Sequence, residues 1–164
     1  MKKIKYILAL FIVSTAFGQK QTNNVDFSNM LQGLLTHSVP EVLPSEIQNM
    51  DQVVFLDARE KTEFATSHIK NALWVGYDNF KKKNVEEVPK DKQIVVYCTV
   101  GYRSEKIAEK LNKMGYTNVS NLYGGIFEWY HNDRKVFNEN AETKKIHTYD
   151  KEWSQWLQKG EKVY

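Results

Sequence analysis

The sequence predicts an α/β fold, a three-layer domain with a central, mostly parallel sheet flanked by helices, followed by a C-terminal helical extension. Two short, almost wholly apolar runs, Val53–Leu56 and Ile94–Tyr97, are typical of strands buried on both faces of a parallel sheet. Segments with helical spacing of apolar residues alternate with these runs, as in α/β domains. A length of 164 residues suits one such domain.

The remaining elements follow in chain order. A short amphipathic helix is expected after a cap at Asp26 or Ser28, because Phe27, Leu31 and Leu34 recur at helical spacing. The other expected elements are a strand and turn over 38–43, a helix start at 44–46, a helix over 60–67, a strand over 72–75, a helix from about Ser104 to Gly115, and a strand over 119–122.

The first eighteen residues have the layout of a secretory signal peptide. Lysines precede an apolar run over 6–13, and the small residues Ala16 and Gly18 predict cleavage before Gln19. A core helix or a membrane anchor is the alternative, but the run is shorter than the roughly 20 apolar residues that cross a bilayer. The expected location is periplasmic or secreted, with no stable membrane insertion after cleavage.

These observations give a domain plan. We expect a signal peptide over 1–18, a flexible lead-in over 19–25, the α/β domain over 26–137, and a C-terminal linker and helix docked on the domain over 138–164.

Charge excludes one class of partner. The formal net charge of +3 includes the three lysines of the leader, so the mature chain is neutral. Nucleic-acid binding normally needs a basic patch, and the short run Lys81–Lys83 is better interpreted as a solvated surface. We therefore expect no nucleic-acid partner.

Cys98 is the single cysteine, so it is buried and inert, paired between chains, or reactive. It directly follows an apolar strand and precedes the loop residues Thr99, Val100, Gly101, Tyr102 and Arg103. A strand, a short loop and a helix N-terminus gather backbone N–H groups around one point and favour a thiolate, the nucleophilic form. Gly101 would allow a positive φ, and Arg103 would add a positive charge suited to oxyanions.

Four segments, taken together and in order, resemble a known family. They are VVFLDAREKTEF at 53–64, SHIKNALWV at 67–75, DKQIVVYCTVGYRS at 91–104 and GYTNVSNLYGGIFEW at 115–129. They resemble the Asp-x-Arg strand end, the Gly-His-Ile-x-Gly-Ala motif, the active-site loop and the Gly-Gly-x-x-x-Trp helix start of rhodanese sulfurtransferases. The expected fold is therefore a three-layer rhodanese-like domain.

The resemblance implies a sulfurtransferase. Under this interpretation, Cys98 takes a sulfane sulfur from thiosulfate or a persulfide, becomes a persulfide, and passes the sulfur to a thiol or cyanide-like acceptor. The resemblance implies that the reaction needs no cofactor and no metal. The alternative is a sulfur-carrier or redox-sensing module that binds a partner protein without turnover. The transferase and the carrier or sensor module would both use the same thiolate loop.

Loop length separates this chain from related phosphatases, which place five residues between the cysteine and the arginine. Four residues separate Cys98 from Arg103, and Ser104 occupies the phosphatase arginine position. The chain departs from the family at the position that binds the donor. Two-domain thiosulfate enzymes have a donor-binding arginine there, whereas this chain has Glu63, which weighs against efficient use of thiosulfate. Ser67 and Asn71 also replace usual glycines, which we expect to alter turn geometry rather than chemistry.

Asp57, Arg59 and Ser104 are the expected supporting residues. Asp57 follows a predicted strand and should lie at the functional edge of the sheet. We interpret Asp57 and Arg59 as a buried or half-buried ion-pair network that ties the strand ends together, with a direct role at the site as the alternative. His68 is best interpreted as bonded to backbone, since the scattered histidines suggest no metal site.

Aromatic residues bear on two questions, the lining of the pocket and the structure of the C-terminal extension. Tyr77, Phe127 and Trp129 could rim the pocket, with core packing as the default. In the extension, Asp150 can cap a helix that places Trp153, Trp156 and Leu157 on one face. The sequence leaves open whether that helix narrows access to Cys98.

Overall fold

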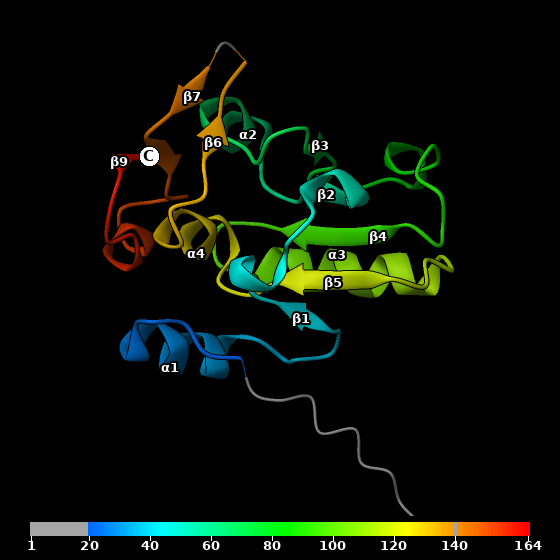
Figure 1. The fold of residues 1–164 in the computed structure, drawn as a ribbon, viewed down its shortest axis with the longest axis horizontal. Helices are drawn as coiled ribbons and strands as arrows, with labels where there is room; N and C mark the ends of the chain where they lie inside the picture. The colour runs from blue at the N-terminus through cyan, green and yellow to red at the C-terminus, as the bar shows by residue number, and fades with distance from the viewer. Residues whose placement is uncertain (1–19, 140) are drawn as a thin grey trace, which may run out of the picture.

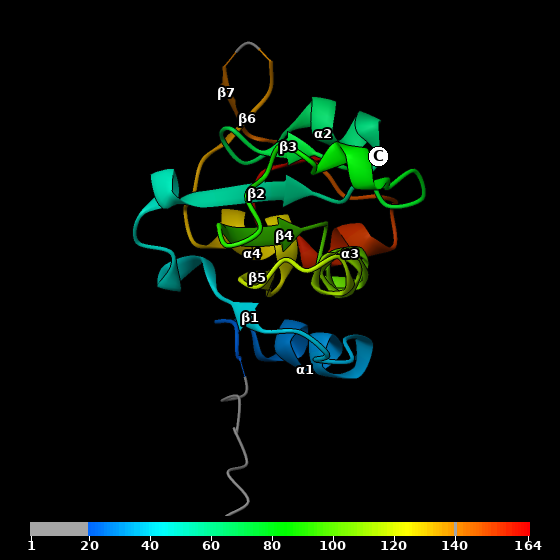
Figure 2. The same cartoon turned by 90° about the vertical axis from the view of Figure 1, so that its right-hand side faces the viewer.

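The computed structural model describes residues 20–139 and 141–164, so the expected signal peptide and its cleavage site lie outside the described residues. Its centre is a five-stranded sheet of order β1-β5-β4-β2-β3, and all four pairings are parallel (Figure 1). The strands are β1 Glu41–Val42, β2 Val53–Asp57, β3 Leu73–Trp74, β4 Gln93–Tyr97 and β5 Val119–Leu122. Figure 2 shows them stacked in this order, from β3 down to β1. The predicted α/β fold with a mostly parallel sheet is confirmed.

In the described part of the chain, four α-helices accompany the sheet: α1 (Val25–Leu34), α2 (Lys61–Thr66), α3 (Tyr102–Lys113) and α4 (Gly125–His131). Alternate residues of the central strands enter two separate apolar clusters. Phe55 and Val95 pack with α1 and α4, whereas Ile94 and Val96 pack with α3. This alternation places helices on both faces of the sheet and produces the three layers.

Part of the segment that was expected as a flexible lead-in packs against α1. Thr22 is buried, and its backbone N–H donates to Ser28 Oγ at 2.8 Å. The cap of α1 is Asn24, whose side chain accepts the N–H of Phe27 at 3.1 Å. The predicted caps were therefore wrong, because Ser28 binds Thr22 instead and Asp26 lies inside the first turn.

The described part of the C-terminal extension, residues 138–139 and 141–164, contains strands where a linker and a helix were expected. β6 (Val136–Phe137) pairs with β7 (Glu142–Thr143), and β8 (Lys145–His147) pairs in parallel with β9 (Glu161–Val163). Between β8 and β9 lies only a short 3₁₀ helix, Trp153–Trp156.

Local hydrogen bonds explain why the helix is short. Asp150 Oδ1 accepts the N–H of Trp153 at 2.9 Å, but the residue at the cap position of the short helix is Glu152 and not the predicted Asp150. The hydroxyl of Ser154 donates to Lys151 O at 2.7 Å and competes with the α-helical backbone pattern. Leu157 is already extended and is buried in the core that contains α1 and α4. The extension therefore packs on the domain through a short 3₁₀ helix and strands rather than through an α-helix.

Among the described residues, none of the helices has both the length and the apolar character needed to cross a membrane.

Candidate active site

Cys98 is the first residue beyond the carboxyl end of β4, and it is 1% exposed. Its sulfur accepts the backbone N–H of Gly101 at 3.2 Å. Gly101 has a φ of +125°, in a region that side chains rarely adopt, and this turn directs its amide back toward the sulfur. The predicted need for glycine in the cysteine loop, residues 98–103, is thus explained by geometry.

The cysteine loop runs directly into α3, which begins at Tyr102 rather than near Ser104 as expected. The backbone bond from Glu105 N–H to Gly101 O, at 3.0 Å, opens the helical ladder. The preceding amides of the first turn have no intrahelical partner and carry the positive end of the helix dipole. Cys98 therefore lies at a helix N-terminus, a position at which proteins commonly bind anions.

α4 contacts the cysteine loop through backbone hydrogen bonds. Ile126 and Phe127 donate their N–H groups to the carbonyls of Cys98 and Thr99, at 2.9 and 3.3 Å. Gly125 has a φ of +57°, and a Cβ atom there would lie 2.5 Å from both carbonyl oxygens. Glycine is required because helix and loop meet without space for a side chain.

Ser104 and Asn121 hold the other side of the loop. The Ser104 hydroxyl lies 2.7 Å from Asn121 Oδ1 and 3.5 Å from Cys98 Sγ, and Asn121 Nδ2 donates to Gly101 O at 3.1 Å. Both side chains are fully buried. The supporting position of Ser104 agrees with the sequence, but Asn121 was missed because an amide in a strand carries no local signal for a tertiary contact.

Arg103 does not offer the free positive charge that the sequence suggested. Its guanidinium makes two hydrogen bonds to the Glu63 carboxylate, of 2.7 and 2.8 Å, and a third to Thr99 Oγ1 of 2.8 Å. Burial alone would raise the pKa of Glu63, but the hydrogen bonds and charge of Arg103, with the charge of Arg59, hold that pKa below its usual value. The two opposite charges compensate one another beside Cys98.

The pKa of Arg103 is also shifted by burial and by the charges around it. Burial alone would lower it, yet the hydrogen bonds to Glu63 and the negative charges of Cys98 and Glu63 raise it above the usual value. The guanidinium therefore stays protonated, close to the sulfur and bound to a carboxylate.

Asp57 and Arg59 form the buried ion pair favoured by the sequence. Both side chains are 0% exposed, their charged atoms approach to 2.6 Å, and Arg59 also donates to Ser67 O at 2.6 Å. Neither residue lines the pocket at Cys98. Their role is to tie strand end and loop together.

His68 likewise is held by backbone and packing. Its Nδ1 lies 3.0 Å from Phe64 O, and its ring stacks on the Phe64 ring at a centroid distance of 4.2 Å. This agrees with the interpretation of His68 as a structural residue.

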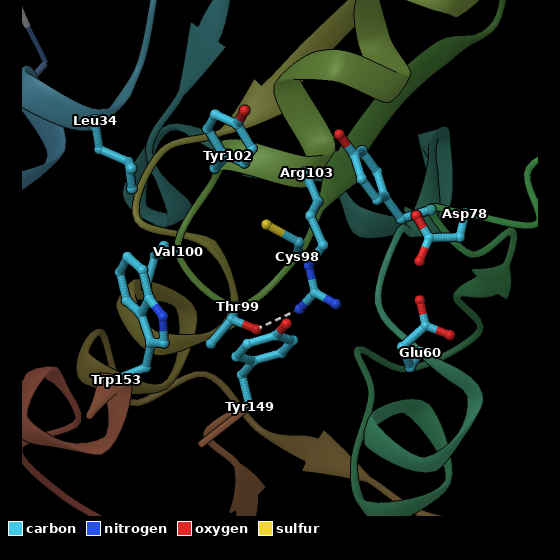
Figure 3. Close-up of a pocket in the computed structure, with 11 residues that line it drawn as sticks. Leu34, Glu60, Asp78, Cys98, Thr99, Val100, Tyr102, Arg103, Tyr149 and Trp153 are labelled. Atoms are coloured by element: carbon cyan, nitrogen blue, oxygen red, sulfur yellow. Dashed lines mark hydrogen bonds between the residues drawn. The ribbon is translucent and has the colours of Figure 1, made fainter. Parts of the chain in front are cut away.

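A pocket of about 480 Å³ opens over Cys98 (Figure 3). Its other lining residues are Leu34, Glu60, Tyr77, Asp78, Thr99, Val100, Tyr102, Arg103, Tyr149 and Trp153. Of the three aromatic candidates, Tyr77 rims the pocket, whereas Phe127 and Trp129 are buried in the core.

The extension forms part of the pocket wall, which answers the question that the sequence left open. Tyr149 and Trp153 line the pocket, and the Tyr149 ring centre lies 5.0 Å from the Arg103 guanidinium carbon. The sequence assigned Trp153 to a helix face and did not single out Tyr149. No local signal identifies either as a pocket residue, because they reach Cys98 only through the docking of the extension.

Fold and site together define a class: an α/β domain that presents one cysteine between a parallel strand and a helix N-terminus. A family model described as the rhodanese-like domain matches residues 40–132. The chain belongs to the rhodanese-like domain family.

Two curated relatives illustrate the family. The chain is 39% identical over 83 residues to a tRNA uridine(34) hydroxylase of Erwinia tasmaniensis, covering 48% of this chain and 24% of that protein. It is 33% identical over 97 residues to the adenylyltransferase and sulfurtransferase UBA4 of Candida albicans, covering 55% and 22%. The chain thus spans under a quarter of the length of either relative.

Solved structures show the same fold. A rhodanese-related protein of Thermoplasma volcanium aligns with a TM-score of 0.52 and 25% identity, over 61% of this chain and 99% of that chain. A thiosulfate sulfurtransferase of Pseudomonas aeruginosa aligns with a TM-score of 0.56 and 18% identity, over 73% and 23%.

Proposed function

We propose that this protein is a sulfurtransferase in which Cys98 carries a sulfane sulfur as a persulfide. One observation carries the proposal: the Cys98 sulfur accepts the Gly101 amide at the N-terminus of α3 while facing a pocket large enough for a substrate. Such a site stabilises a thiolate before the reaction and an anionic persulfide after it. The name of the relative UBA4 includes sulfurtransferase activity, which supports the same chemistry.

The first half-reaction loads the cysteine. The Cys98 thiolate attacks the outer sulfur of a donor such as thiosulfate or an organic persulfide, and a new S–S bond forms. The donor's own S–S bond breaks, and sulfite or an organic thiolate leaves with the electron pair. Cys98 then holds one additional sulfur.

The second half-reaction regenerates the enzyme. A thiolate or cyanide attacks the outer sulfur of the Cys98 persulfide, the Cys98 S–S bond breaks, and its electron pair returns to the Cys98 sulfur. The acceptor leaves as a persulfide or as thiocyanate. No external oxidant or reductant is consumed in either step.

Intact-mass spectrometry tests the loading step. Protein lacking residues 1–18 is treated in turn with thiosulfate, polysulfide and glutathione persulfide, and one added sulfur that cyanide removes is the expected result. Cys98→Ser is the control and should gain none. A wild-type protein that gains no sulfur from any of the three donors would overturn the proposal.

Turnover separates the transferase from the alternative carrier or sensor module. A transferase should release many equivalents of product for each Cys98 when donor and acceptor are both in excess. A single equivalent, with the persulfide remaining until a partner protein is added, would favour the carrier.

We also propose that the protein works outside the cytoplasm, on the basis of the leader-like residues 1–18. N-terminal sequencing of protein from fractionated cells should find a mature chain that begins near Gln19. An intact N-terminus in the cytosolic fraction would contradict this part of the proposal.

A further inference from the structure

We propose that the substrate handled at Cys98 is an amine-bearing organic thiol or its persulfide, rather than a small inorganic dianion. This inference rests on the proposed sulfurtransferase function and names its substrate class. Three features of the pocket carry it: a compensated cation, two unpaired carboxylates and an aromatic wall.

The cation beside Cys98 is already neutralised. Arg103 gives both of its terminal nitrogens to Glu63, whose side chain is 2% exposed and therefore held in place. The sulfur itself is negative when reactive. A dianion that enters this pocket consequently meets the negative charge of Cys98 without a free guanidinium to offset it.

Two further carboxylates line the pocket and have no cationic partner. Glu60 stands at the N-terminus of α2, and Asp78 follows β3. Figure 3 shows their carboxylate groups pointing toward one another on the same side of the pocket. Within the described part of the chain neither forms a salt bridge, so both charges remain available to a ligand.

The remaining walls suit an organic body. Tyr77 and Tyr102 lie on the family domain, and Tyr149 and Trp153 come from the extension. A volume of about 480 Å³ lies in the range of pockets that bind organic ligands, roughly 300–1,000 Å³, and greatly exceeds what a small inorganic anion fills. Tyr149 and Trp153 lie outside the matched residues 40–132, so this wall belongs to the chain's own extension.

An aminothiol satisfies these features together. Its sulfur reaches Cys98, its methylene groups contact the aromatic rings, and its ammonium group lies between Glu60 and Asp78. As acceptor, its thiolate attacks the outer sulfur of the Cys98 persulfide and leaves as the aminothiol persulfide, while the electron pair returns to Cys98. As donor, the aminothiol persulfide is attacked at its outer sulfur by the Cys98 thiolate, its S–S bond breaks, and the aminothiol leaves as a thiolate with the electron pair.

The test compares two acceptors on preloaded protein. Cys98 is loaded with polysulfide, excess donor is removed, and loss of the persulfide is followed with cysteamine and with 3-mercaptopropionate, one cationic and one anionic. The ratio of the two second-order rate constants is measured in wild type and in the double variant Glu60→Gln, Asp78→Asn. Intrinsic thiol reactivity cancels between the proteins, because the same acceptors are used for both.

We expect the ratio to fall about tenfold in the double variant, the size expected when two nearby charges are removed from a partly exposed site. The matched control is Glu86→Gln, Asp91→Asn, which removes the same charge at exposed positions outside the pocket lining. It should leave the ratio at the wild-type value.

The outcomes distinguish the two proposals. Protein that never loads with sulfur contradicts the sulfurtransferase function itself. Protein that loads normally, but whose ratio is the same in wild type and in the pocket variant, overturns only the substrate class. A fall of equal size in the control variant also overturns it, because long-range charge would then be the cause.

Discussion

The cysteine loop and the C-terminal extension both reach the pocket, but they are held in different ways. The loop is fixed largely by backbone, through the Gly101 amide on the sulfur and the α4 amides on the carbonyls. The extension contributes side chains, and one of them, Tyr149, is 52% exposed. In the proposed function, the loop held by backbone carries the chemistry, and the exposed side chains of the extension contribute to the choice of substrate.

The largest expected effect on stability comes from Gly125→Ala, which disrupts the backbone contacts between α4 and the cysteine loop. The methyl group would overlap the carbonyls of Cys98 and Thr99 at a φ of +57°, so we expect a loss of about 3 kcal/mol in the free energy of unfolding. Urea unfolding measures this loss, and sulfur loading should fall with it.

Gly33→Ala is the matched control for that substitution. Gly33 lies inside α1 with no atom within 4 Å of an added Cβ, so alanine should stabilise the protein by about 0.5–1 kcal/mol. If both variants unfold like wild type, α4 does not constrain the loop as described.

The next effect comes from Glu63→Gln, which breaks the ion pair beside the loop. Glu63 is almost fully buried and Arg103 partly so, and we expect a loss of about 2 kcal/mol at neutral pH. Urea unfolding measures it. Glu109→Gln removes a more exposed pair with Lys106 and should cost less than about 0.5 kcal/mol. Equal losses in the two variants would contradict the special role of the Glu63 pair.

The pH dependence of the same variant follows from the lowered pKa of Glu63. A carboxyl whose pKa is lower in the folded protein contributes stability above its ordinary value of 4.5, and that contribution is lost as the pH falls through the folded value. The difference in unfolding free energy between wild type and Glu63→Gln should therefore shrink from pH 7 toward pH 3. A constant difference would mean that Glu63 is not ionised in the pair.

The smallest effect is expected for Tyr149→Ala in the extension wall. Its ring lines the pocket and lies over Arg103, so alanine removes part of the apolar wall that the methylene groups of cysteamine would contact, and the KM for cysteamine should rise about threefold. Tyr164→Ala removes another exposed tyrosine outside the pocket lining and should not change KM. An unchanged KM in Tyr149→Ala would remove the extension from substrate selection.

The sequence predicted the sheet and the cysteine loop well because their determinants are local. Continuous apolar runs predicted β2 and β4. Gly101 indicated a turn that needs a positive φ. The position of Cys98 between strand and helix followed directly from these two features.

The pairing of charges and the form of the extension depend on distant contacts. Glu63 meets Arg103 across forty positions, and nothing in either neighbourhood indicates the partner. In the extension, pairing of residues 145–147 with 161–163 prevails over a capped helix pattern. Both features arise from tertiary packing, which local propensity does not encode.

The central claim is that Cys98 passes a sulfane sulfur onward, and a single-turnover experiment tests it most directly. Cys98 is loaded with isotopically labelled outer sulfur, freed of donor, and mixed with excess thiol acceptor. We predict that the label leaves Cys98 and appears in the acceptor persulfide at the same rate, with the free thiol restored. Label that stays on Cys98, or that leaves only as free sulfide without an acceptor persulfide, would contradict the account.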